Sequence, residues 1–258
     1  EIALKSQGQE VFFRKNDGTI MTNASKEISK LFSDSLMDLF RRGNTYLIDK
    51  TFSASDEYLR ENAENCEYLW LVNPITGIAA YFNGGNTFSI TVSLFVRKIP
   101  FFSAIYLPVT KEIVYNTLKR SFYLKNAFTE NEKRRSLYFQ DKHRKYNNII
   151  HVSQEYMEKN LKESEKYSYV DNDSAIFHTF NVIIERAKAV IFHKGSYLWD
   201  IFPGVSTARI IGYKYYEIET GREISKIELD LFDKEYKATK DILFVHPKYF
   251  DEIMALIK

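Results

Sequence analysis

The chain has 258 residues, 45% hydrophobic and 16% aromatic, enough to bury the core of one large domain or of two packed subdomains. Its formal net charge of +2 argues against general polyanion binding, so we expect no nucleic-acid partner. The single cysteine, Cys66, excludes a disulfide framework, and no apolar run approaches the roughly 18 residues of a membrane span. We therefore expect a cytoplasmic protein that has no membrane partner.

The first half of the chain shows helix patterns followed by strand patterns. Residues 3–7 are typical of the end of a helix, and Asp17-Gly18 predicts a turn. Apolar residues at three- and four-residue spacing predict a helix over 25–40. The later segments alternate between apolar and polar residues, as strands of an antiparallel meander do. Strands are expected at 45–48, 69–72, 88–96, 101–106 and 112–118, and 55–65 is charged and typical of a helix or a loop.

A charged stretch over 129–146 is the best candidate for a connection between two halves. Its basic residues favour a solvated surface over an anion-docking patch. Strand and helix patterns alternate after it, so we predict an α+β subdomain over 1–128 and an α/β subdomain over 147–258. The elements expected in the second subdomain are strands at 148–152 and 189–192 and helices at 154–165, 177–186 and 199–211.

Two short segments carry most of the functional information. Residues 69–78 read LWLVNPITGI, a buried strand that runs into a turn and then a helix start. Residues 199–204 read WDIFPG, in which Asp200 could cap a helix N-terminus. Neither segment is specific alone, and the five histidines show no metal-ligand spacing. Cys66 has no neighbouring base in the sequence, so we expect a half-buried thiol and not a nucleophile.

Four blocks of the sequence, by their order along the chain and their spacing, resemble the inositol monophosphatase superfamily, and most closely its CysQ-type 3′(2′),5′-bisphosphate nucleotidases. Residues 69–78 resemble the metal-binding turn Asp-Pro-Ile/Leu-Asp-Gly-Thr, and 199–204 resemble the second signature Trp-Asp-x-Ala-Ala-Gly. Residues 15–25 resemble Lys-x-Asp-x-Ser-Pro-Val-Thr-x-Ala-Asp, and 104–109 resemble the nucleotidase strand Gly-Val-Val-Tyr-Ala-Pro-Val. The resemblance implies a layered α/β/α/β/α sandwich, with an α+β and an α/β half, and an ancestral Mg²⁺-dependent, Li⁺-sensitive hydrolysis of a phosphomonoester.

The resemblance also implies where the metal ligands would lie. Active relatives hold two or three Mg²⁺ ions with a cluster of carboxylates, because Mg²⁺ requires oxygen ligands. Only Asp200 and Asp49 keep an acid. For Asp49, whose alignment depends on the length of a loop, a solvated carboxylate at a strand end is the favoured interpretation. The remaining positions have changed: they are Ser25, Lys50, Asn73 and Thr76 at ligand positions and Ile78 where the family has the threonine that orients water.

The charge balance argues against metal catalysis. Two divalent ions carry roughly four positive charges, and Asp49 and Asp200 offset only two of them. Lys50 adds a further positive charge. Neutral Asn73 and Thr76 supply no counter-charge. The resemblance therefore implies a degenerate site with no intact catalytic residue, with Asp49 and Asp200 as weak remnants of the metal site. No cofactor is expected, although active relatives use Mg²⁺.

Three functional hypotheses follow. The leading one is a catalytically impaired or inactive relative that binds a small phosphorylated ligand or a partner, with the backbone N–H groups of Gly77 and Ile78 facing the phosphate. The second is an active Mg²⁺-dependent phosphomonoesterase, a nucleotidase or an inositol monophosphatase, with a metal held by Asp200, Asp49 and backbone oxygens. The third is a structural or interaction protein that forms a homodimer.

Overall fold

The structure is a computed structural model that describes residues 1–9, 11–14, 20–51, 57–140, 148–171 and 174–258. The turn expected around Asp17-Gly18 lies outside these residues. The helices of the described part are α1 (Ile2–Ser6), α2 (Asn23–Arg41), α3 (Glu57–Asn65), α4 (Ile78–Phe82), α5 (Gln154–Asn160), α6 (Ala175–Ile183), α7 (Leu198–Ile201), α8 (Val205–Ile210) and α9 (Phe250–Met254), with short 3-10 turns η1 (Leu229–Leu231) and η2 (Pro247–Tyr249).

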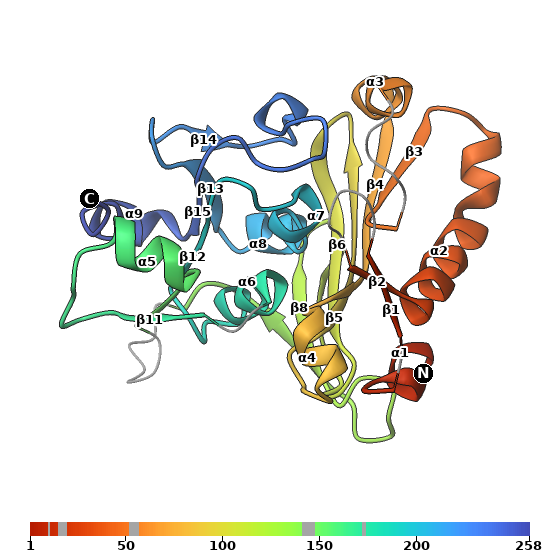
Figure 1. Cartoon of the computed structure of the whole chain (residues 1–258), viewed down its shortest axis with the longest axis horizontal. Helices are drawn as coiled ribbons and strands as arrows, with labels where there is room; N and C mark the ends of the chain where they lie inside the picture. Colours follow the sequence, from red (N-terminus) through yellow and green to blue (C-terminus); the bar gives the residue numbers. More distant parts are fainter. Residues whose placement is uncertain (10, 15–19, 52–56, 141–147, 172–173) are drawn as a thin grey trace.

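Helices and sheets alternate in five layers (Figure 1). Helices α1 and α2 lie at one end, followed by a seven-stranded sheet, the central helices α6, α7 and α8, a six-stranded sheet, and finally α5 and α9 beside the C-terminus. This arrangement confirms the predicted α/β/α/β/α sandwich. In the described ranges, no helix combines the length and the apolar character needed to cross a membrane.

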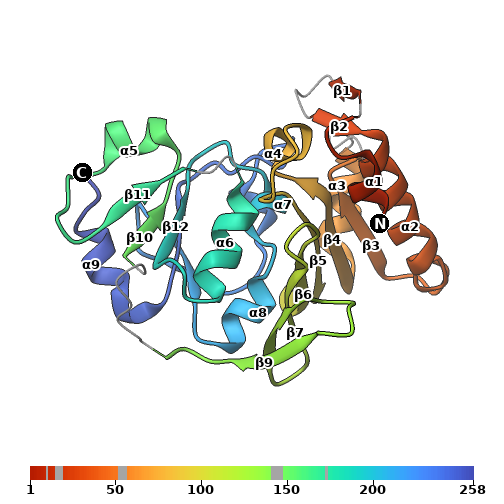
Figure 2. The same cartoon turned by 90° about the horizontal axis from the view of Figure 1, so that it is seen from below.

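The first sheet has the strand order β3-β4-β5-β6-β7-β8-β9, in which β3 and β4 are parallel and all other neighbours are antiparallel (Figure 2). Along β5 buried and partly exposed residues alternate, which fits one face packed on the central helices. The strands are β3 (Thr45–Asp49), β4 (Tyr68–Thr76), β5 (Ser89–Val96), β6 (Ile99–Leu107), β7 (Glu112–Asn116), β8 (Ser121–Lys125) and β9 (Lys133–Leu137).

Strand β9 lies within the segment 129–146 that the sequence marks as a charged connection. Its charged residues are exposed, and only Leu137 is buried, where it pairs with Ser121 of β8. Charged residues are common on edge strands because they discourage pairing with another chain. The charge pattern therefore reflects a sheet edge at this place, whereas the division into 1–128 and 147–258 stays a prediction.

The second sheet has the order β11-β10-β12-β15-β13-β14. Its central strands β12 and β15 are buried at every residue, as expected of strands covered by helices on both faces. The strands are β10 (Ile149–His151), β11 (Ser168–Val170), β12 (Ala189–Phe192), β13 (Lys214–Glu217), β14 (Glu223–Ile224) and β15 (Ile242–Val245), and a separate hairpin is formed by β1 (Phe12–Arg14) and β2 (Ile20–Thr22).

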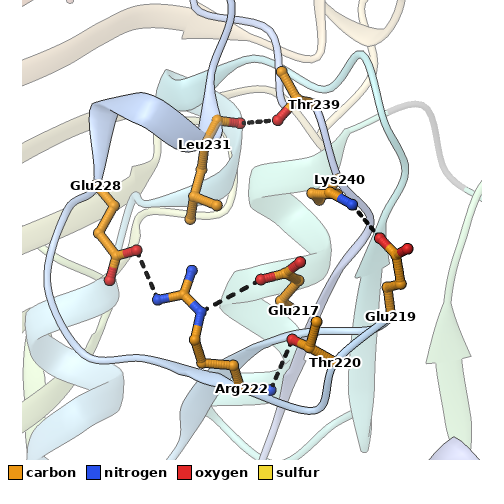
Figure 3. Close-up of polar contacts among 8 residues, drawn as sticks. All are labelled: Glu217, Glu219, Thr220, Arg222, Glu228, Leu231, Thr239 and Lys240. Carbon is orange, nitrogen blue, oxygen red and sulfur yellow. Dashed lines mark hydrogen bonds and ion pairs between the residues drawn. The ribbon is translucent and has the colours of Figure 1, made fainter.

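Arg222 ties the outer edge of this second sheet together (Figure 3). Its guanidinium lies 3.4 Å from Glu217 of β13 and 2.7 Å from Glu228, which precedes η1. Glu217 is only 7% exposed, so Arg222 supplies the counter-charge that a buried carboxylate requires. The neighbouring pair of Lys240 and Glu219 is solvent-exposed and contributes little.

Candidate functional site

The turn after β4 is built from a bulge and a left-handed glycine. The register between β4 and β5 shifts between Asn73 and Thr76, where Pro74 has no N–H to give to the ladder. Gly77 then adopts φ 73° and ψ 48°, and α4 begins directly after it. A Cβ on Gly77 would lie 3.1 Å from Ser174 Oγ, so both the backbone and the available space favour glycine. The helix start predicted after this turn is therefore present.

The second signature places an acid opposite that turn. Residues 199–211 do not form the single helix expected from the sequence, because Gly204 adopts φ 75° and separates α7 from α8. Trp199 is 2% exposed and anchors α7 in the core. Asp200 lies in the first turn of α7, yet its side chain does not cap the helix. It points instead toward the end of β4, where it accepts hydrogen bonds.

Asp200 is satisfied by the two residues that stand at the lost metal-ligand positions. Asn73 Nδ2 donates to Asp200 Oδ1 at 2.9 Å, and the Thr76 hydroxyl donates to the same oxygen at 3.4 Å. Both side chains keep neutral oxygens, but neither carries the negative charge that an aspartate at the same position would bring to a metal. The structure thus brings together Asn73, Thr76 and Asp200, three of the positions that the resemblance singled out, and here they are partners in hydrogen bonds.

The end of β3 contributes a buried acid. Asp49 is 2% exposed, so its description as a solvated strand-end carboxylate is wrong. The Ser29 hydroxyl of α2 and the Thr51 N–H donate to Asp49 Oδ1 at 3.0 and 2.6 Å. Parallel pairing of Asp49 with Val72 carries the end of β3 to the start of the metal-type turn. No pattern in the sequence indicates Ser29 at this site.

Lys50, the next residue, reaches into the turn. Its Nζ donates to the backbone carbonyl of Ile75 at 3.2 Å. Burial lowers the pKa of Lys50 from its usual value, and the charges of Asp200 and Asp49 oppose this shift. Burial likewise raises the pKa of Asp200, opposed by Lys50, Thr76 and Asn73. The ammonium and the carboxylates therefore stabilise each other's charged forms in an environment that disfavours both.

Two further positions in the predicted set have structural roles. Ser25 forms a capping box with Thr22 at the start of α2: each backbone N–H donates to the other side chain at 2.9 Å. Ile78 packs against the apolar cluster that contains Tyr81 and Phe88. These contacts account for a serine and an isoleucine without any metal.

The residues present do not fit a Mg²⁺ cluster. Mg²⁺ requires an octahedron of oxygen ligands, usually with carboxylates among them. Here Asn73 and Thr76 stand as neutral residues where carboxylates would be needed, and the Ile75 carbonyl accepts from the Lys50 ammonium. Asn73 Oδ1 is buried without a hydrogen-bond partner in the described structure, so the turn offers a neutral oxygen here and no carboxylate of its own. Among the described residues, no three His, Cys, Asp or Glu side chains gather as a metal site would require.

A second polar cluster was not anticipated. His151 at the end of β10 and His178 of α6 stack with ring centroids 4.2 Å apart and planes at 7°. Burial lowers the pKa of His151 to about 4 and the pKa of His178 well below its usual value. Because 27 positions separate them, no local pattern could have paired them. Cys66 is half-buried, as expected, and burial raises the pKa of its thiol.

The comparisons with known proteins agree with this geometry. The chain matches the profile of the inositol monophosphatase family over residues 2–255 and belongs to that family. No curated protein sequence matches it significantly.

Solved structures show the same fold at low sequence identity. The chain is similar to a staphylococcal IMPase-I complexed with products (15% identity, TM-score 0.69, covering 96% of this chain and 86% of the other). It is also similar to an IMPase of Thermotoga maritima (14% identity, TM-score 0.71, covering 99% of this chain and 90% of the other). A third similar structure is an IMPase/NADP phosphatase complexed with Mg²⁺ and phosphate (15% identity, TM-score 0.68, covering 96% of this chain and 86% of the other). At these identities the structures establish the fold and leave the activity of this chain open.

Proposed function

We propose that the chain is a catalytically impaired or inactive member of the inositol monophosphatase family that binds a small phosphorylated ligand without divalent metal. One observation carries the loss of catalysis: neutral Asn73 and Thr76, which donate hydrogen bonds to Asp200, and the Lys50 ammonium stand at the turn, so the negative charge that divalent metals need is missing. In active relatives metal ions polarise the ester and activate water. Ile78, which has no hydroxyl, cannot replace the threonine that orients this water.

The chain's own groups support binding of a phosphate. The backbone N–H groups of Gly77 and Ile78 lie at the turn into α4, and Lys50 brings a positive charge to the same turn. The ligand would gain hydrogen bonds from these groups, but no activated water. The likeness of residues 104–109 to the nucleotidase strand supports an ancestor among the bisphosphate nucleotidases.

The rearranged-metal alternative is the less favoured proposal. A metal held by Asp200, Asp49 and backbone oxygens would have to displace the Lys50 ammonium from the Ile75 carbonyl. It would also have to break the Asn73 hydrogen bond to Asp200. Phosphate release from inositol 1-phosphate, 3′-phosphoadenosine 5′-phosphate and fructose 1,6-bisphosphate with Mg²⁺ should equal the blank. Lithium-sensitive turnover of any of the three would instead establish the active alternative.

Ligand binding has its own test. Titration calorimetry with 3′-phosphoadenosine 5′-phosphate and with inorganic phosphate should give the same affinity in EDTA and in Mg²⁺. Gly77→Ala should abolish binding, because a Cβ there meets Ser174 and Phe88 and shifts the turn. Gly43→Ala is the matched control, since Gly43 has a similar φ of 79° with nothing within 4 Å. Equal binding by both variants would exclude the turn as the phosphate site.

A further inference from the structure

Lys50 links the end of β3 to the turn after β4 through its backbone and its side chain. Its backbone N–H donates to the Val72 carbonyl at 3.3 Å, which fixes the end of β3 against β4. Its side chain then extends to the Ile75 carbonyl, 3.2 Å from Nζ. The bulged turn that carries Asn73 and Thr76 is thereby held from the β3 side, while Asp200 holds it from the α7 side.

The charges around Lys50 have the sign that a metal ion would compensate. Asp200 and Asp49 are the two acids whose charges act on it. A buried carboxylate without a counter-charge is strongly destabilising, and an ammonium is a compact point charge with three donors. One of those donors is used on the Ile75 carbonyl of the turn.

We propose that Lys50 takes the place of a divalent metal: its ammonium offsets part of the negative charge of Asp200 and Asp49 and holds the turn after β4, so the site assembles without Mg²⁺. The proposal goes beyond the proposed function, because it concerns how the site is held together and applies whether or not a ligand binds. It also assigns Lys50 a structural function, holding the turn after β4, whereas the sequence alone indicated only the loss of an acidic ligand.

The test is a double-mutant cycle on thermal stability in the full chain, with EDTA and with Mg²⁺. Lys50→Met keeps the length of the side chain and removes the charge, and it should lower Tm by about 10 °C. Lys50→Met/Asp200→Asn removes both charges and should recover at least half of that loss. Mg²⁺ should raise the Tm of Lys50→Met and leave the parent unchanged, because only the variant lacks its cation.

Lys98→Met is the matched control. Lys98 is also partly buried and donates to a backbone carbonyl, that of Ala63 at 3.1 Å, but neither Asp49 nor Asp200 is among the charges that act on it. Its loss of stability should simply add to that of Asp200→Asn. Additive effects of Lys50→Met and Asp200→Asn, or a parent Tm that rises with Mg²⁺, would overturn the proposal.

Two outcomes need separate treatment. If Lys50→Met does not fold, recovery of a folded Lys50→Met/Asp200→Asn supports the proposal, and failure of both variants overturns it. The double-mutant cycle measures thermal stability and not phosphate binding. A calorimetric titration without binding would therefore refute the proposed ligand, and the role of Lys50 would still be judged on stability alone.

Discussion

Restoring the acids at three positions should convert the site into one that depends on metal. The variant is Lys50→Glu/Asn73→Asp/Thr76→Asp, which gives the end of β3 and the turn after β4 the charges that the family pattern carries. Ser25 and Ile78 are left unchanged, because the first caps α2 and the second packs in an apolar cluster. Metal ligands act as a unit, so single reversions should produce almost no metal binding.

The structure sets the size of the effect. The variant loses two hydrogen bonds donated to the Asp200 carboxylate, at 2.9 and 3.4 Å, and each bond to a charged group contributes about 1.5–3 kcal/mol. Repulsion among the added carboxylates increases the cost, although proton uptake limits it. A loss of at least about 3 kcal/mol lowers Tm by roughly 6–12 °C in a chain of this size. Mg²⁺ at 100 times its Kd should restore about 2.7 kcal/mol.

Differential scanning fluorimetry with EDTA and with Mg²⁺ measures both changes. The control is Asn73→Asp/Thr76→Asp with Lys50 retained, which adds acids but keeps the ammonium at the Ile75 carbonyl. It should respond to Mg²⁺ much less than the triple variant. The reasoning would be refuted by a triple variant that folds and shows no stabilisation by Mg²⁺, since the three positions would then not surround one site.

Three other outcomes are expected. Burial lowers the pKa of His151 from 6.5 to about 4. Its neutral form therefore contributes roughly 3 kcal/mol to the free energy of unfolding above about pH 6.5, and this contribution is lost as the pH falls towards 4. Urea unfolding between pH 7.5 and 4.5 should show that loss, and His151→Phe should make it smaller. Arg222→Ala should cost about 1 kcal/mol by leaving Glu217 without its partner, whereas Lys240→Ala should cost close to nothing in the same urea assay. Ser25→Ala should lower the free energy of unfolding by about 1 kcal/mol through loss of the capping box and leave the response to Mg²⁺ unchanged. A changed response to Mg²⁺ would instead indicate a metal role for Ser25.

Much of the fold could be predicted because it depends on local patterns. The apolar spacing over 25–40 corresponds to α2, and the alternation over 88–96 corresponds to β5. Strand β9 was hidden because its exposed edge residues are charged. The helix expected over 199–211 is interrupted because Gly204 adopts a left-handed conformation, which the sequence permits but does not require.

The candidate site was predictable only in part. Order and spacing of the blocks indicated that Asn73, Thr76 and Asp200 lie together, and the structure places them within hydrogen-bonding distance. Sequence could not indicate that the two neutral residues donate to the acid. The direction of a hydrogen bond and the contact of Lys50 with a backbone carbonyl depend on the bulge in β4, which no residue pattern specifies.

The most direct test of the account is a crystal structure with Mn²⁺ and phosphate at high concentration, with anomalous scattering used to locate the metal. If Lys50 takes the place of the metal, Lys50 Nζ will lie at the Ile75 carbonyl, Asn73 will donate to Asp200, and no anomalous peak will lie between them. A manganese ion bound by Asp200 and the Ile75 carbonyl, with the Lys50 side chain displaced, would contradict it.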